Sequence, residues 1–134
     1  MPDPMPLFVA GRRRPARSRV TRTIVNPATL EPLGTAIDCN HEDVDAAVTA
    51  AAAAQPAWWR IPGADKARML HEVATRIRAR QRDLSTLMAR ETGKPLIEAV
   101  DCIEWVAACF DYYAEVERQS FGNSIPPVAP HQVN

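Results

Sequence analysis

The sequence has few of the residues on which common catalytic and binding motifs depend. Its five glycines lie at positions 11, 34, 63, 93 and 122, too far apart for the G-x-G-x-x-G turn that binds a dinucleotide. The three histidines and three cysteines show no metal-ligand spacing and no Cys-x-x-Cys pair. No run approaches the roughly 18 uninterrupted apolar residues of a membrane span. The sequence therefore shows no recognisable nucleotide, metal or membrane signature.

What is present is typical of a globular chain. Apolar residues make up 46% and charged residues 24% of the sequence, as in globular proteins. A length of 134 residues is enough for one domain with a core and too short for two. The net charge is zero but unevenly placed. Residues 1–30 carry six arginines against Asp3 alone, a net charge of +5, so the remainder carries −5.

The basic segment from Arg12 to Arg22 admits three interpretations: a nucleic-acid arm, a targeting peptide or a solvated β-ribbon. A targeting peptide forms an amphipathic helix, which the prolines at positions 2, 4, 6 and 15 disfavour. The ribbon is the favoured interpretation. We expect no cleaved signal, a cytoplasmic location, and cysteines that stay reduced, as is usual there.

Residues 7–37 predict short strands and turns, and the rest predicts helices. Strands at Thr23–Val25 and Leu33–Ile37 flank the turn-forming residues 26–29 in a hairpin or ribbon. Asn40 is a good N-cap for the first helix, with Asp43 at its third position. Pro56 is expected to end that helix near Ala54, leaving the two tryptophans at 58 and 59 to anchor a loop.

Three further helices are expected. Helical spacing of apolar residues indicates one from about Ala64 to Gln81, and Asp83 is expected to cap a short third helix. The fourth should run from Pro95 to about Arg118 with two apolar stripes. The first stripe contains Leu96, Val100, Ile103, Ala107, Phe110 and Ala114, and the second contains Cys102, Trp105, Cys109, Tyr112 and Val116. A helix with two such stripes needs partners on two sides.

The stretch RETGKPLIEA, residues 90–99, raises the question of a phosphate-binding loop. That motif needs a glycine five residues before Gly93, where Met88 stands, and Ser or Thr after Lys94, where Pro95 stands. Helix punctuation fits better, with Gly93 ending one helix in the left-handed conformation and Pro95 beginning the next.

The remaining nucleophiles and acids form no recognisable active site. Cys102 and Cys109 fall in the middle of the fourth helix among apolar neighbours, where a thiol is inert. Cys39 precedes a helix start, but only His41 is near it in the chain. Glu98 and Asp101 fit a helix surface better than an acid/base pair. We therefore assign no catalytic, cofactor-binding or metal-binding residue.

The same RETGKPLIEA stretch resembles a signature of the NAD(P)-dependent aldehyde dehydrogenases, in the N-terminal region of that family. Further matching pieces occur in the family's order from about residue 7 to residue 127. They are Asn26-Pro27-Ala28-Thr29, Gly34, Asp43-Val44, Ala46-Ala47-Val48, Pro56-Ala57-Trp58, Arg68 with Leu70, Tyr112-Tyr113-Ala114, Gly122 and Ile125-Pro126. No single piece is decisive, but the ordered set is specific.

The resemblance implies an α/β family fold in which this chain is the mostly helical N-terminal part, a short β-hairpin or ribbon followed by about four helices. It implies that residues 1–127 belong to an incomplete cofactor-binding domain and 128–134 to an extended tail or linker. In the family a cysteine thiolate attacks the aldehyde, hydride passes to NAD or NADP, and a glutamate activates water. We expect this chain to stop before those groups, so that it binds no cofactor alone and is inactive alone.

Some features depart from the family, and alternatives remain open. The arginine-rich segment is more basic than the family's usual opening hairpin, and neither Asp101 nor Glu104 matches the register of a family cation site. The expected partners are the remainder of the subunit or other subunits of a homo-oligomer. The alternatives are a small helical module that uses the Arg12–Arg22 arm on nucleic acid or an acidic partner, and a truncated chain that associates with full-length subunits.

Overall fold

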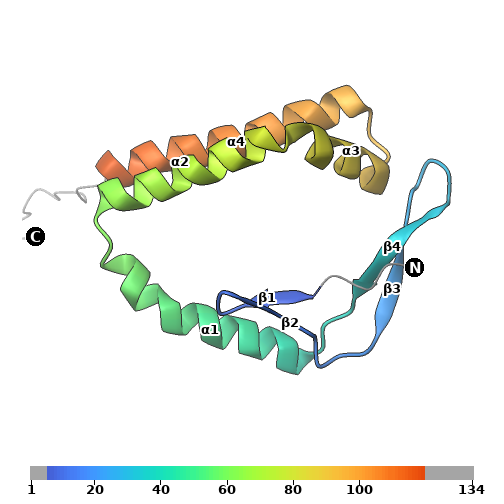
Figure 1. The fold of residues 1–134 in the computed structure, drawn as a ribbon, viewed down its shortest axis with the longest axis horizontal. Coiled ribbons are helices and arrows are strands. Elements are labelled where there is room, and N and C mark those ends of the chain that lie inside the picture. Colours follow the sequence, from blue (N-terminus) through green and yellow to red (C-terminus); the bar gives the residue numbers. More distant parts are fainter. Residues whose placement is uncertain (1–5, 120–134) are drawn as a thin grey trace, which may run out of the picture.

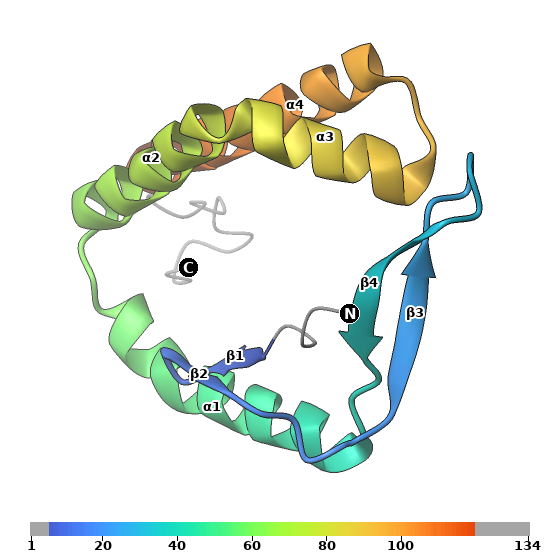
Figure 2. The same cartoon turned by 45° about the vertical axis from the view of Figure 1, so that its right-hand side comes forward.

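The computed structural model describes residues 6–119, which form two β-hairpins followed by four helices. In Figure 1, helices α2 (Gly63–Ala79), α3 (Gln81–Thr92) and α4 (Leu96–Gln119) form one layer. Helix α1 (His41–Trp59) lies apart from that layer, with the first hairpin against it, and the second hairpin lies at one side between them, as Figure 2 shows. The expected mostly helical chain with four helices is confirmed.

Both sheets are small and antiparallel. Strand β1 (Leu7–Val9) pairs with β2 (Arg12–Arg14), and β3 (Thr21–Val25) pairs with β4 (Pro32–Ile37). The expected strands at 23–25 and 33–37 are confirmed within longer ones, joined by the expected turn, in which Asn26 Oδ1 accepts a hydrogen bond from the N–H of Ala28. Strand β2 lies within the basic segment that was expected to form a solvated ribbon, although no bounds were predicted for it. It forms because the adjacent turn at Ala10 and Gly11, both at positive φ, folds the three arginines back onto β1.

Helix α1 begins where the sequence predicts and ends later. Asn40 Oδ1 accepts a hydrogen bond from the N–H of Asp43 at 3.0 Å, which confirms the N-cap. The expectation that Pro56 ends the helix was wrong, because α1 continues to Trp59. Residues 51–60 are all exposed, so water can satisfy the carbonyl that a proline leaves without an N–H partner. The tryptophans therefore belong to the last turn of α1 rather than to a loop.

The helix junctions mostly follow the local signals. Gly93 ends α3 at φ 75°, with its N–H donating to Ala89, which confirms helix punctuation. Pro95 lies one residue before α4 and accepts a hydrogen bond from the N–H of Ala99. The expectation that Asp83 caps the third helix was wrong, because α3 begins at Gln81. Asp83 lies within the first turn, where its carboxylate interacts favourably with the positive end of the helix dipole.

The core among the described residues lies between α2 and α4 and is made of small side chains. Its buried apolar residues are Ile103 and five alanines, at positions 67, 74, 99, 107 and 114. Alanines let two helices approach closely but bury little area each, so the hydrophobic stabilisation is small. Within residues 6–119, eighteen large apolar residues remain exposed, from Phe8 to Val116. None of the helices in residues 6–119 is long and apolar enough to cross a membrane. The tail 128–134, Gly122 and Ile125-Pro126 lie outside the described residues.

Candidate functional site

The candidate nucleophiles, bases and metal ligands do not come together among the described residues. Cys39 is exposed, and its neighbour His41 lies 3.4 Å from Asp45 of its own helix, so the geometry provides no thiol–imidazole pair. No group of three or more histidine, cysteine or acidic side chains among residues 6–119 is arranged to hold a metal ion. The expectation of apolar neighbours is confirmed for Cys109, which lines a hollow with Leu70, Phe110 and Tyr113. Cys109 is exposed, and the half-buried Cys102 lies 3.1 Å from the Lys94 ammonium.

Two motif pieces far apart in the sequence meet in the structure. A β-carbon placed on Gly93 would lie 2.8 Å from Cγ of Pro27, so the turn of the second hairpin lies directly against the α3–α4 junction. Both turns lie at the same end of the molecule in Figure 1. Gly93 therefore has two reasons to be glycine, its positive φ and the proximity of Pro27. The shared function of these two motif pieces is to join the hairpin to the helices.

A buried carboxylate joins the segment between the two hairpins to α1. Asp43 is 2% exposed, and its two carboxylate oxygens accept hydrogen bonds from the backbone N–H groups of Arg17 and Ser18 at 2.8 and 3.0 Å. The bond from Arg17, followed by that from Ser18, lowers the pKa of Asp43. Arg17 also pairs with Glu42, and Arg22 pairs with Asp38. These two arginines are thus engaged inside the chain, which weakens the hypothesis of a nucleic-acid arm.

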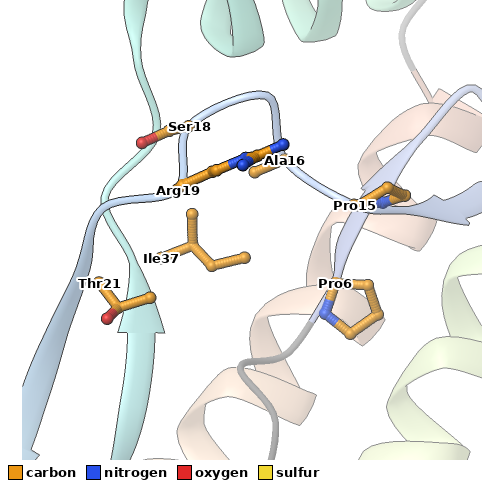
Figure 3. A pocket seen from close by; sticks show the side chains of 7 residues that line it. All are labelled: Pro6, Pro15, Ala16, Ser18, Arg19, Thr21 and Ile37. Carbon is orange, nitrogen blue, oxygen red and sulfur yellow. The ribbon is translucent and has the colours of Figure 1, made fainter.

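A hollow next to this connection is shown in Figure 3. Its volume is about 420 Å³, and Pro6, Pro15 and Ile37 give it an apolar lining, with Arg19 extending across it. On the neighbouring strand, Nε and Nη2 of Arg14 are buried and find no acceptor among the described residues. A buried donor without an acceptor is costly. This part of the surface therefore resembles a protein interior that the described residues cover only in part.

Charged residues link α2 to α4. His71 lies with Nδ1 2.6 Å from Asp111 and Nε2 2.9 Å from Glu115. Arg78 donates to Glu104 and also to Asp111, the latter at 2.7 Å. Asp111, followed by Glu115, raises the pKa of His71, while the bonds from His71 and then Arg78 lower the pKa of Asp111. The acids of α4 thus contribute to packing between helices rather than to a catalytic pair.

The outward side of α4 carries large apolar side chains that the described residues leave exposed. Opposite the buried Ala107 and Ala114, the predicted second stripe is solvent-exposed, with Trp105 73% and Tyr112 64% exposed. A hollow of about 280 Å³ beside Trp105 is lined by Asp101, Glu104 and Ala108. Exposed apolar surface of this extent is characteristic of an interaction surface. The expectation that α4 presents an uncovered apolar stripe is confirmed.

The described residues do not fit a dinucleotide. Such a cofactor lies across the carboxyl ends of parallel strands, at a glycine-rich turn that leads into a helix. Both sheets here are antiparallel, and the segment from Asp38 to Asn40 that leads from β4 into α1 contains no glycine. No catalytic step through such a cofactor can be derived from these residues.

Known proteins resemble this chain in both sequence and fold. The sequence profile of the aldehyde dehydrogenase family matches residues 14–134. The chloroplastic aminoaldehyde dehydrogenase ALDH10A8 of Arabidopsis thaliana is 40% identical over 137 residues, which cover 96% of this chain and 27% of that protein. An NADP-dependent enzyme of E. coli superposes with a TM-score of 0.87 at 28% identity, covering 95% of this chain and 26% of that one.

The enzyme PnpE, solved in complex with nicotinamide adenine dinucleotide, superposes with a TM-score of 0.85 at 30% identity. The match covers 93% of this chain and 26% of PnpE. This chain thus spans about a quarter of the length of the proteins that it matches. With a family profile that covers most of its residues and a fold shared with solved members, the chain belongs to the aldehyde dehydrogenase family.

Proposed function

We propose that this chain is the N-terminal part of the cofactor-binding domain of an NAD(P)+-dependent aldehyde dehydrogenase, and that it takes part in catalysis only within a complete subunit. The observation that carries the proposal is the extent of the match. Nearly the whole chain aligns with the relatives, while the relatives are about four times longer.

The contribution of this chain would be structural. Its two hairpins and four helices supply exposed apolar surfaces, above all the α4 stripe with Trp105 and Tyr112. These surfaces favour burial against the remainder of the subunit, or against other subunits of a homo-oligomer. Taken alone, the chain is proposed to be inactive, because no cysteine among the described residues is hydrogen-bonded to a histidine and the turns there do not fit a dinucleotide.

An amino-bearing aldehyde is the first substrate class to test. The support is the similarity to ALDH10A8, which is named an aminoaldehyde dehydrogenase. The reaction would be oxidation of the aldehyde to the carboxylic acid, with NAD+ or NADP+ as the hydride acceptor. The groups that attack the carbonyl and bind the cofactor would come from the remainder of the subunit.

The coding sequence beyond Asn134 provides the test. We expect an in-frame continuation that brings the polypeptide to about four times this length and that encodes a dinucleotide-binding unit and a nucleophilic cysteine. The complete polypeptide should reduce NAD+ or NADP+ with aldehydes, aminoaldehydes among them. A stop codon directly after Asn134, followed by unrelated sequence, would remove the proposal that the chain is part of a longer subunit.

Salt-sensitive binding of DNA or RNA by this chain would instead favour the alternative of a binding module that uses the Arg12–Arg22 segment.

A further inference from the structure

The His71 side chain occupies an unusual position between α2 and α4. Each of its two ring nitrogens faces a carboxylate of α4, Nδ1 at 2.6 Å from Asp111 and Nε2 at 2.9 Å from Glu115. The two acids are four residues apart and therefore lie one helical turn apart on α4. The imidazole ring thus bridges two successive turns of the opposite helix.

This geometry specifies the protonation state of the ring. A neutral imidazole carries one N–H group and one bare nitrogen, whereas an ionised carboxylate can only accept hydrogen bonds. Both contacts are hydrogen bonds only when both ring nitrogens carry a proton. In the neutral ring, one bare nitrogen would face a carboxylate oxygen at a hydrogen-bond distance, and that contact would become repulsive.

The charges around the ring point the same way. Three acids of α4 gather here, Glu104, Asp111 and Glu115, and Arg78 of α2 pairs with the first two. With a charged His71 the cluster has a net charge of −1, and with a neutral His71 it has −2. Deprotonation of His71 would therefore both remove a hydrogen bond and increase the repulsion among the acids.

We propose that His71 is a pH-sensitive clasp that holds the C-terminal half of α4 firmly against α2 when protonated and loosens this contact when neutral. Ala67, Ala74 and Ala114 are buried between these helices, and the clasp adds to that packing along the C-terminal half of α4. A second link, between Lys66 and Glu117, lies nearer the end of α4 and involves no histidine. It would remain when the clasp opens.

The direction of the pH dependence follows from linkage. Hydrogen bonds with Asp111 and Glu115 raise the pKa of His71 above its ordinary value of 6.5. A group with a raised folded-state pKa contributes its full stabilisation below the unfolded-state value. That stabilisation is lost as the pH rises through the raised value. The clasp should therefore be closed below about pH 6.5 and open progressively in the range above it.

Titration of the His71 ring in the 134-residue chain, followed by NMR, tests the proposal directly. We expect a midpoint above 6.5 that moves down in Asp111→Asn and in Glu115→Gln. Glu98→Gln is a matched control on the same helix, since Glu98 has no contact with the ring among the described hydrogen bonds. A midpoint at or below 6.5, or one unchanged by both variants, would overturn the proposal. An unfolded chain would also titrate at the ordinary value and would count against it.

Backbone hydrogen exchange supplies the conformational readout. After correction for the intrinsic pH dependence of exchange, the amides of α4 from about residue 108 onward should exchange faster above the His71 midpoint than below it. His71→Gln should exchange fast at both pH values, and His41→Gln, changed in α1, should retain the wild-type dependence. Equal protection of α4 in wild type on both sides of the midpoint would show that no clasp opens.

Discussion

Replacement of Gly93 by alanine should weaken the connection between the second hairpin and the helices. The residue has φ 75°, and left-handed backbone costs a residue with a β-carbon about 1–2 kcal/mol. The new β-carbon would also lie 2.8 Å from Cγ of Pro27. Overpacking of this kind costs about 1–3 kcal/mol, so the two effects together amount to roughly 2–5 kcal/mol. That is a large share of the roughly 5–15 kcal/mol by which a domain is stable.

Urea unfolding of the 134-residue chain, followed by far-UV circular dichroism, measures the loss, and other glycines separate its causes. Gly11 has the same φ with no atom within 4 Å of an added β-carbon, so Gly11→Ala should show the backbone cost alone. Gly34→Ala has neither penalty and should change stability by no more than about 0.5 kcal/mol. In a Pro27→Ala background, Gly93→Ala should cost less. Equal losses for Gly93→Ala and Gly11→Ala, or no relief from Pro27→Ala, would refute the steric reasoning.

Two further outcomes are expected. Trp105→Ser combined with Tyr112→Ser should reduce self-association of the chain in analytical ultracentrifugation without loss of helix content, because both side chains are exposed on α4. A wild-type chain that is already monomeric would contradict this. Asp43→Asn should lower the urea midpoint at neutral pH. The difference from wild type should shrink as the pH falls below 3.8, because the folded-state pKa of Asp43 lies below that value. A difference independent of pH would show that the charge of Asp43 does not contribute to stability.

The elements that the sequence predicted correctly are those governed by local chemistry. The Asn40 cap, the left-handed Gly93 and the turn at residues 26–29 each depend on a few neighbouring residues, and all three are present. Pro56 was misjudged because its cost depends on whether the opposing carbonyl is exposed to water, which tertiary structure decides. The bounds of strand β2 could not be predicted because three consecutive arginines carry no alternation, and the turn before them sets the pairing.

The contacts that join the helices and hairpins could not be predicted from the sequence. His71 meets Asp111 across 40 positions, and Pro27 meets Gly93 across a longer separation still. Asp43 was assigned to the first turn of its helix, which is correct, but nothing local shows that its carboxylate also binds the backbone of residues 17 and 18. The uncovered side of α4 could be predicted, because two apolar stripes on one helix exceed what a chain of this length can bury.

Under the proposed function, this chain is one part of an oxidising enzyme and carries no aldehyde dehydrogenase activity of its own. The direct measurement is NADH and NADPH formation by the purified 134-residue chain with a panel of aldehydes that includes aminoaldehydes, in parallel with the complete polypeptide from the continuous coding sequence. We predict no turnover by the chain and NAD(P)+-dependent oxidation by the complete polypeptide. Turnover by the chain alone, or none by the complete polypeptide with any aldehyde, would contradict the account.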